Sequence, residues 1–591
     1  MAGITLFVTL GIAGLTALLV TIASNTRETG PRVESDSILT FNLAQEITDS
    51  STSAEPTALI GAALSGGNAD GSLPLRSALE SIRNATTDDR IKGLLLYGSI
   101  APNRSGSGFA TLREVRQALV AFRNSGKPIY AYDDAQWQER DYYLASVANT
   151  VLVNPNSLLE INGFSAENIF YAGALQKYGI GIQILRVGKF KSAIEPLTRT
   201  QNSPEAKAQS QALLTDLWNE FVAAASKSRK LTPQQLQTIA DQQGMLMPEQ
   251  AKAAGLVDQV AYEDEVVAKL QGLTGEKKGS DALRQINLSN YAQAVAAQNQ
   301  RSSQNQVAVI YAEGDIVSGE GNPGQIGGDT LARLLRKTRQ DDHVKAVVLR
   351  INSPGGSATA SALVSREVAL TKEKKPIIVS MGTYAASGGY EISTNASRIF
   401  ASPTTITGSI GVFGILPNVQ SIAKNNGITW DTVKTGRLAD GDTISRPKTP
   451  EELAIGQRIV DRVYDQFISL VATSRGIPKQ KVADIAQGRV WSGLQAKKLG
   501  LVDELGGLED AIQAAVKQAN LGDDWQIEEY PKPRSLEEQL GRLLGNSTQA
   551  ATPTDRLTQE FQKLGQDLDV LRSMNDPLGV YSRLPFTPRI D

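Results

Sequence analysis

Short hydrophobic runs alternate with longer, helix-length segments along most of the chain. Ala346–Ile351 is a nearly continuous hydrophobic run of strand length, which is typical of a strand buried on both faces of a parallel sheet. Pro204–Ser228 and Pro450–Arg475 have the length and composition of helices. This alternation predicts β-α units and therefore an α/β fold.

The same pattern occurs twice in the chain. Three pairs of similar segments keep their order at offsets of 253, 248 and 245 residues: 88–96 with 341–349, 127–129 with 375–377, and 250–258 with 495–503. Several matching blocks in one order are the mark of an internal duplication. We therefore expect two homologous α/β domains with parallel sheets.

The duplication sets the domain boundaries. We expect the first copy at residues 38–270 and the second at residues 306–525. Residues 271–305 are rich in Gln, Asn, Ser and Lys, which favours a linker, and residues 526–591 form a polar tail.

The N-terminal segment is strongly apolar. Ile4–Val20 carries no charged side chain and is close to the ~20 residues that span a bilayer, so we predict a transmembrane anchor over residues 1–25. A cleaved signal peptide is the alternative, although no Lys or Arg precedes the apolar run. The charges that follow have mixed sign and do not fix the orientation.

Composition removes several classes of function. The net charge of −2 and the lack of a basic cluster with interleaved aromatics disfavour nucleic-acid binding. The absence of cysteine excludes disulfides, thiolate nucleophiles and Cys-ligated metals. The single histidine, His343, precedes a predicted strand and is interpreted as a surface residue, so a hydrolase built on this chain needs a base other than histidine.

The positions where the two copies differ carry the candidate chemistry. At the offset of 248, Lys191 aligns with Ala439, and Ser409 aligns with Ile161. Each copy therefore has a reactive group that the other lacks. A serine whose proton is taken by a neutral lysine is a known variant of the catalytic triad, and we predict Ser409 as nucleophile and Lys191 as general base.

Two further features fit this chemistry. A lysine base requires a pKa roughly three units below its ordinary value of about 10.4, which an apolar pocket supplies, and Phe190 and Ile194 flank Lys191. Gly355 and Gly356 follow the strand-like run and can approach a substrate closely, so we predict their backbone N–H groups as the oxyanion hole.

Four motifs resemble one known family: GKFKSAIEP at 188–196, RINSPGG at 350–356, AASGGY at 385–390 and TGSIGVFG at 407–414. They are similar to those of signal peptide peptidase A, also called protease IV, in its long, duplicated form. The resemblance implies a Clp protease-like (crotonase) fold in each half and a homotetramer. It also implies that the first half lends the lysine and the second half the serine.

The resemblance further implies the partners and setting of the enzyme. Apolar peptides such as cleaved signal peptides are the expected substrates, next to membrane lipid, with no metal or organic cofactor. We expect a bacterial-type membrane, crossed once, with the catalytic domains on the non-cytoplasmic side. The family uses a hydroxyl to orient the lysine, and Thr429 is the expected residue because it follows Gly427-Ile428.

Other interpretations remain open. Ser387, in AASGGY, resembles the serine of the Clp peptidases and is the rival nucleophile; because those enzymes pair it with a histidine, we prefer Ser409. The alternatives to a peptidase are a non-catalytic, crotonase-like membrane scaffold and an acyl-CoA enzyme of the same superfold, since a fold alone does not fix a function.

Overall fold

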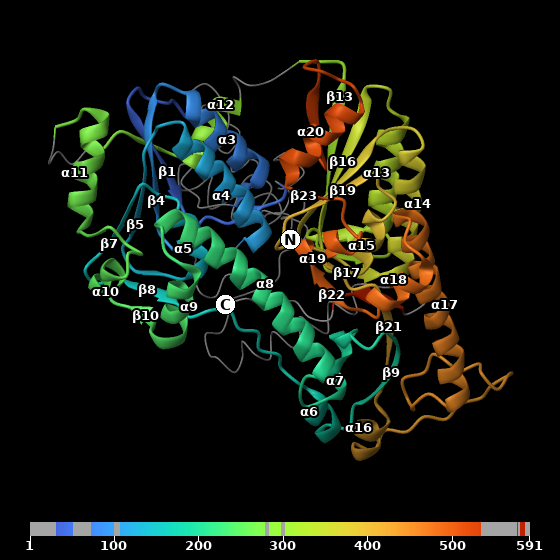
Figure 1. The fold of residues 1–591 in the computed structure, drawn as a ribbon. Helices are drawn as coiled ribbons and strands as arrows, with labels where there is room; N and C mark the ends of the chain where they lie inside the picture. The colour runs from blue at the N-terminus through green and yellow to red at the C-terminus, as the bar shows by residue number, and fades with distance from the viewer. Residues whose placement is uncertain are drawn as a thin grey trace, which may run out of the picture.

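The computed structural model describes residues 31–50, 72–99, 107–277, 283–296, 302–532, 576 and 580–584. Two α/β halves, coloured blue to green and yellow to red in Figure 1, lie side by side, in agreement with the α/β class predicted from the sequence. The predicted anchor at residues 1–25 lies outside the described residues. Within the described ranges, no helix combines the length and the hydrophobicity needed to cross a membrane.

The first half is built on a six-stranded sheet of order β11-β7-β5-β4-β1-β12, in which every neighbouring pair is parallel. Its strands are β1 (Ser37–Asn42), β4 (Ile91–Tyr97), β5 (Ile129–Asp133), β7 (Thr150–Val153), β11 (Gln259–Val260) and β12 (Gln285–Asn287). A smaller sheet joins β6 (Gln136–Trp137), β8 (Leu158–Ile161) and β10 (Gly244–Leu246), and β2 (Ile47–Thr48) pairs with β3 (Leu73–Pro74).

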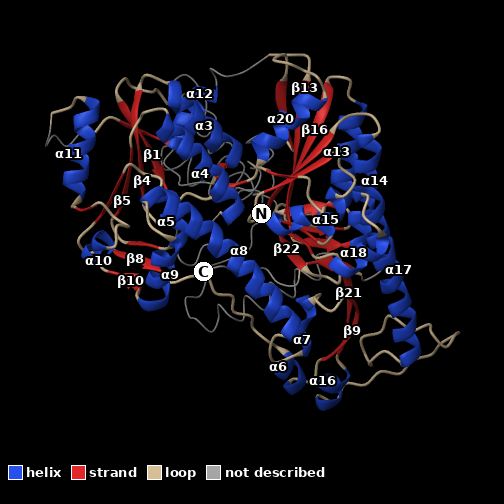
Figure 2. Cartoon of the chain, in the orientation of Figure 1, coloured by secondary structure: helices blue, strands red, loops and turns tan. Residues whose placement is uncertain are grey.

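Helices pack against the sheet of the first half (Figure 2). They are α3 (Leu75–Thr87), α4 (Phe109–Asn124), α5 (Glu139–Ala145), α9 (Pro233–Gln242), α10 (Pro248–Ala253), α11 (Glu263–Thr274) and α12 (Leu288–Ala296). β12 and α12 fall within the residues expected to form a linker. Because β12 pairs with β1, it covers an edge of the sheet that would otherwise expose unpaired backbone groups.

The second half contains an eight-stranded sheet whose main path is β22-β20-β18-β16-β13-β24. Its strands are β13 (Gln306–Glu313), β16 (Val344–Ser353), β18 (Ile377–Ala386), β19 (Arg398–Ala401), β20 (Ile406–Gly408), β22 (Val490–Ser492), β23 (Glu504–Leu505) and β24 (Gln526–Tyr530). Its helices are α13 (Gly328–Gln340), α14 (Ala358–Lys372), α15 (Gly388–Ser393), α16 (Gln420–Asn425), α17 (Pro450–Arg475), α18 (Lys479–Ile485), α19 (Gly493–Lys498) and α20 (Leu508–Gln518).

The hydrophobic run predicted as a buried strand lies within β16. Ala346 and Val348 pack in the cluster that includes α20, whereas Val347 and Leu349 face the opposite core. Successive side chains of a strand point to opposite faces, so a continuous hydrophobic run is required where helices cover both faces. The sequence pattern and the burial therefore have the same cause.

The two long helices begin at side-chain caps. The Ser203 hydroxyl accepts the N–H of Ala206 at the start of α8 (Pro204–Arg229), and Thr449 forms a capping box with Glu452 at the start of α17. Both caps satisfy backbone donors that have no partner inside the helix, and proline follows each at the first helical position.

A third sheet joins the two halves. Its order is β15-β14-β17-β25-β21-β9, with β9 (Gly181–Val187), β14 (Asp315–Val317), β15 (Gln325–Gly327), β17 (Gly355–Ser357), β21 (Val412–Asn418) and β25 (Tyr581–Arg583). β9 comes from the first half, yet it pairs antiparallel with β21 of the second half along its whole length. α6 (Ala172–Lys177) comes before β9 in the chain, and α7 (Glu195–Thr198) comes after it. Because β9 pairs with β21, this stretch of the first half is held against the second half, as Figure 1 shows.

A buried ion network also crosses between the halves. Arg350 of β16 is fully buried and binds Asp49 and Glu114, both from the first half, at 2.8 and 2.9 Å. A buried guanidinium is tolerated only when it is paired, so β16 is tied to the first half just before β17, which begins at Gly355.

Candidate active site

Lys191, Ser409 and the alternative nucleophile Ser387 come together where two neighbouring strands end. Ser387 directly follows β18 and Ser409 directly follows β20. The two strands are parallel neighbours, with Ala386 opposite Gly408, so the serines leave the sheet side by side. Lys191 reaches them from the first half because β9 crosses to pair with β21. All three side chains belong to one chain.

Lys191 binds both serines. Its Nζ lies 2.6 Å from Ser387 Oγ, 3.0 Å from Ser409 Oγ and 3.0 Å from the carbonyl oxygen of Ser409. The three residues are all 0% exposed. Lys191, expected from the sequence to be a general base, is therefore in direct contact with each candidate nucleophile.

Burial also tunes the lysine. The pKa of Lys191 lies well below its ordinary value because its surroundings exclude the water that would stabilise the ammonium ion. The lysine is therefore available in its neutral form, which a general base requires.

The arrangement distinguishes the two serines. A neutral amine has two N–H groups and one lone pair. Ser409 presents two acceptors to Lys191, its hydroxyl and its carbonyl oxygen, which can take both N–H groups. The lone pair then remains for the hydroxyl of Ser387, which is also the closest of the three oxygens at 2.6 Å. The geometry favours Ser387 as the group that is deprotonated and Ser409 as the group that orients the amine.

Both serines have unusual backbone conformations. The φ of 56° and ψ of −114° of Ser387 lie in a region that side-chain-bearing residues rarely adopt. The conformation is held by the N–H of Ser387, which donates to the carbonyl of Gly408 at 2.7 Å. Strained conformations of this kind persist where the surrounding structure fixes them and are concentrated at functional sites. Ser409 also has a positive φ, of 53°, so strain alone does not separate the two.

The glycines predicted as an oxyanion hole lie beside Ser387. A side chain on Gly355, whose φ is 101°, would stand 2.8 Å from the backbone nitrogen of Gly388. The N–H of Gly355 itself donates to Ser353 Oγ at 3.1 Å. A Cβ on Gly388 would be 3.3 Å from the nitrogen of Gly356. The backbone nitrogens of Gly356 and Gly388 therefore lie close to each other beside Ser387, and their N–H groups are the candidate oxyanion donors.

Gly388 was not predicted from the sequence, although it directly follows Ser387. As the first residue of α15, its N–H has no acceptor within the helix. The position after a nucleophile at a strand-to-helix turn is a known source of oxyanion donors, and this was the available signal.

Thr429, expected to orient the lysine, lies elsewhere. It is exposed in the irregular segment after α16, and the hydrogen bonds of Lys191 go to Ser387 and Ser409. The internal repeat shows where Thr429 belongs. It is the counterpart of Gly181, at the start of β9 and ten residues before Lys191, so it lies in the second-half copy of the lysine segment and not beside the lysine itself. The structure thus does not bring Thr429 to the site.

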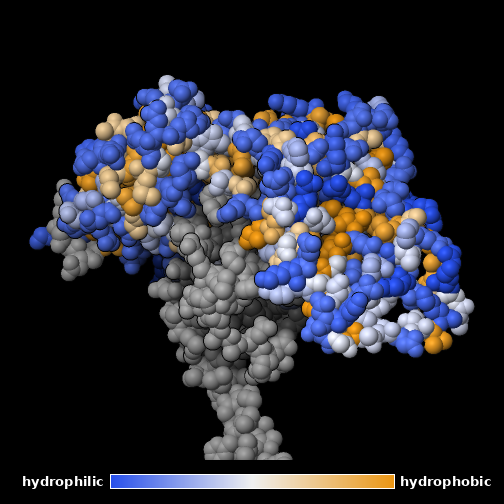
Figure 3. Space-filling model, turned by 90° about the horizontal axis from the view of Figure 1, so that it is seen from below, coloured by the Kyte–Doolittle hydropathy of each residue, from blue (hydrophilic) through white to orange (hydrophobic). Residues whose placement is uncertain are grey.

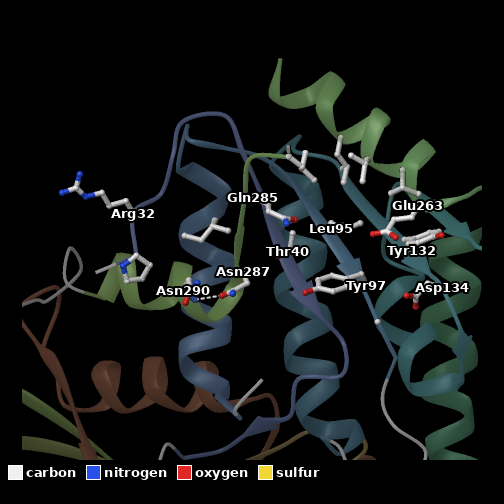
Figure 4. A pocket seen from close by; sticks show the side chains of 17 residues that line it. Arg32, Thr40, Leu95, Tyr97, Tyr132, Asp134, Glu263, Gln285, Asn287 and Asn290 are labelled. Atoms are coloured by element: carbon white, nitrogen blue, oxygen red, sulfur yellow. Dashed lines mark hydrogen bonds between the residues drawn. The ribbon is translucent and has the colours of Figure 1, made fainter. Parts of the chain in front are cut away.

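A separate pocket of about 670 Å³ lies in the first half (Figure 4). Thr40 of β1, Tyr97 of β4 and Tyr132 of β5 line it, together with Glu263 of α11. Lys191 and the two serines do not contribute to its walls. It is therefore a feature distinct from the candidate active site.

Comparison with known proteins gives the same picture of a duplicated chain. The profile of peptidase family S49 matches twice, over residues 121–277 and 369–522. Protease 4 of Salmonella typhi is 36% identical over 520 residues, which cover 85% of this chain and 82% of that protein. Protease 4 of Haemophilus influenzae is 35% identical over 531 residues, with coverages of 85% and 83%.

A plant protein and a solved structure are also similar. The chloroplastic serine protease SPPA of Arabidopsis thaliana is 32% identical over 496 residues, covering 83% of this chain and 70% of that protein. The structure of ClpP1 from Listeria monocytogenes matches 34% of this chain and 91% of its own at 16% identity, with a TM-score of 0.21. This structural match is too weak to bear on the fold.

Proposed function

This chain belongs to peptidase family S49 and is a serine peptidase, and we propose that Ser387 is its nucleophile and Lys191 its general base. The observation that carries the proposal is the 2.6 Å contact between Lys191 Nζ and Ser387 Oγ in a fully buried setting. Ser409, the nucleophile predicted from the sequence, takes the role of orienting the amine, which had been expected of Thr429.

The proposed reaction begins with proton transfer. Neutral Lys191 takes the proton of Ser387 as Oγ attacks the peptide carbonyl, and the N–H groups of Gly356 and Gly388 stabilise the oxyanion. The ammonium of Lys191 then returns this proton to the leaving amine, which leaves an acyl group on Ser387. Water, deprotonated by the same lysine, attacks the ester; the acid is released, and the lysine ammonium returns the proton to Ser387 Oγ. No metal or organic cofactor enters these steps.

Two substitutions test which serine attacks. Ser387→Ala should lower kcat for an apolar fluorogenic peptide by roughly a thousandfold or more, because no nucleophile remains. Removal of the nucleophile from other serine hydrolases has an effect of this order. Ser409→Ala should retain measurable activity, since it removes one of two acceptors that hold the lysine. Mapping the residue modified by a lipophilic fluorophosphonate gives an independent readout. Labelling of Ser409, together with an active Ser387→Ala variant, would reverse the assignment.

We further propose apolar peptides, such as residual signal peptides, as substrates at a bacterial-type membrane, with the catalytic halves on the non-cytoplasmic side. The apolar N-terminal segment of the sequence supports this setting, as do hydrophobic patches on both halves on the face seen in Figure 3. Each half is proposed to have a Clp protease-like (crotonase) fold, which the parallel sheets support. Family membership favours this peptidase over the scaffold and the acyl-CoA enzyme.

Self-association into a homotetramer is also proposed, by the same strand exchange that joins the halves. At the repeat offset of 248, β9 corresponds to residues 429–435 and β21 to residues 164–170. Neither segment is part of a described strand, and Val433 is 97% and Trp430 49% exposed. Pairing residues 429–435 of one copy with 164–170 of the next would bury these side chains.

The mass in solution tests this association. Trp430→Asp combined with Val433→Asp should reduce the sedimentation mass to that of a single chain, whereas Lys345→Asp, at an exposed position outside both segments, leaves an assembled form. A wild-type protein that sediments as one chain would exclude the tetramer.

A further inference from the structure

Residues 580–584, close to the C-terminus, lie inside the candidate active site. β25 runs antiparallel to β17, with Ser582 directly opposite Gly356. Backbone hydrogen bonds on either side extend the pairing: the Ala358 N–H donates to Val580, and the Leu584 N–H donates to Pro354 at 2.7 Å. The segment is thus an added strand alongside β17, which contains the proposed oxyanion donor Gly356.

Ser582 touches the reacting groups. Its hydroxyl is 2.6 Å from the hydroxyl of Ser387, and it is 0% exposed. A Cβ on Gly355 would be 2.1 Å from the carbonyl oxygen of Ser582, and one on Gly388 would be 3.2 Å from it. The carbonyl of Ser582 therefore lies in the space between Ser387 and the oxyanion donors, where the carbonyl of a substrate reacts.

The side chains of the segment alternate in burial as those of a bound peptide do. Val580 and Leu584 are each 2% exposed and pack in the two hydrophobic cores, whereas Tyr581 and Arg583 are half-buried. Strand addition is a common mode of peptide recognition in which main-chain bonds give affinity and pockets for alternate side chains give specificity.

Contacts outside the catalytic residues fasten the segment. Arg583 Nε donates to Asp315 Oδ1 of β14 at 2.9 Å. Asp576 accepts the hydroxyl of Ser357 at 2.5 Å and the N–H of Thr359 at 2.9 Å. These anchors lie before and after Ser582, so they fix its register along β17.

We propose that residues 580–584 are a built-in pseudosubstrate that competes with peptides for the site, an inference that rests on the proposed function. Because the segment is part of the chain, its effective concentration at the site is high, and a substrate must displace it. The segment also identifies the peptides that fit: extended, with a small residue at the reacting carbonyl and apolar residues two positions to either side.

Charge reversal of one anchor tests the proposal in the full chain. Arg583→Glu and Asp315→Arg should each weaken the segment and lower KM for a peptide with the Val-x-Ser-x-Leu pattern at least threefold (about 0.6 kcal/mol), with kcat little changed. The double variant Arg583→Glu with Asp315→Arg restores the ion pair with its charges exchanged and should return KM to the wild-type value. Arg333→Glu, which reverses an exposed pair with Glu320, is the matched control and should leave KM unchanged.

The rate at which a small fluorophosphonate labels Ser387 provides a second measurement, since this probe need not contact Asp315. Faster labelling of both single variants and a wild-type rate in the double variant support the pseudosubstrate. Ser387-dependent turnover with unchanged KM and labelling in the single variants would overturn it. Absence of Ser387-dependent turnover in every variant would instead refute the proposed function.

Discussion

The two halves hold different groups at the same place in the repeat. Glu139 in the first half is the counterpart of Ser387, and Ile161 is the counterpart of Ser409. The carboxylate of Glu139 accepts the N–H groups of Asn162 and Gly163 at 2.7 and 2.8 Å, and burial raises its pKa to about 7. The first half thus has a buried carboxylic acid, Glu139, at the position where the second half has the hydroxyl of Ser387.

The difference shows how a duplicated fold divides the parts of one site. Lys191 belongs to the first half, but β9 delivers it to the serines of the second half. The corresponding segment of the second half carries Ala439, which is exposed and lies outside the described strands. Because Lys191 serves the second half, the first half needs no serine at these positions, and Glu139 and Ile161 are buried in its packing instead.

The largest expected effect comes from the lysine that the first half contributes. Lys191→Arg and Lys191→Met should each reduce kcat/KM by at least about a thousandfold, because guanidinium stays protonated and a thioether cannot accept a proton. Lys189→Met, two residues earlier, serves as the control and should retain activity. Steady-state kinetics with an apolar peptide measure both, and an active arginine variant would eliminate the lysine as base.

A second prediction concerns whether the first half can replace the second. Adding Glu139→Ser and Ile161→Ser to the Ser387→Ala chain should leave it inactive. The amine of Lys191 is held at the serines of the second half, and Ala439, the counterpart of Lys191, has no amine to offer position 139. Fluorophosphonate labelling should likewise find no reactive serine at position 139. Restored turnover would show that the first half contains a base of its own.

The pH dependence should be intermediate in size. Acylation requires neutral Lys191, so the rate should rise up to tenfold per pH unit at low pH and level off above its lowered pKa, well below the ordinary value for lysine. The free energy of unfolding should also rise with pH. Between the lowered pKa of Lys191 in the folded chain and its ordinary pKa in the unfolded chain, only the unfolded chain holds a proton on this amine, so raising the pH favours the folded state. Lys191→Met should remove this slope in melts recorded against pH. A rate that falls as pH rises through this range would contradict a neutral lysine.

The smallest expected effect is on stability at the counterpart site. Since the folded pKa of Glu139 is raised to about 7, the native state holds a proton that the unfolded state loses above about pH 4, and stability falls as pH rises toward 7. Glu139→Gln should flatten this decline and stabilise the chain by roughly 1 kcal/mol at pH 8, without changing kcat. Denaturant unfolding at pH 5 and pH 8 measures the difference.

Much of the fold follows from local patterns in the sequence. α17 has the bounds predicted for it, and α8 ends one residue later, because proline and a capping hydroxyl fix where each begins. The comparison of the two copies also found Lys191 and Ser409, since their counterparts are inert. The same comparison could not rank Ser387 against Ser409, because the choice depends on which acceptors surround the amine.

Other parts depended on long-range contacts. β12 pairs with β1 over more than two hundred residues, so its residues resemble a linker until the sheet is known. Val580–Leu584 reads Val-Tyr-Ser-Arg-Leu, which has no regular alternation of apolar and polar residues, and nothing local indicates that it would pair with Gly355–Ser357. Thr429 was chosen by its neighbours along the chain, and the exchange of β9 moved the lysine to a different set of neighbours.

The crossing of β9 also has a consequence for the order of events during synthesis. A ribosome releases β9 and Lys191 long before it has made the two serines and β21, the strand that pairs with β9. Until then the growing chain contains an amine without a serine to activate. Peptidase activity is therefore expected only after the second half has folded and β21 has paired with β9. An incomplete chain should not cleave other proteins.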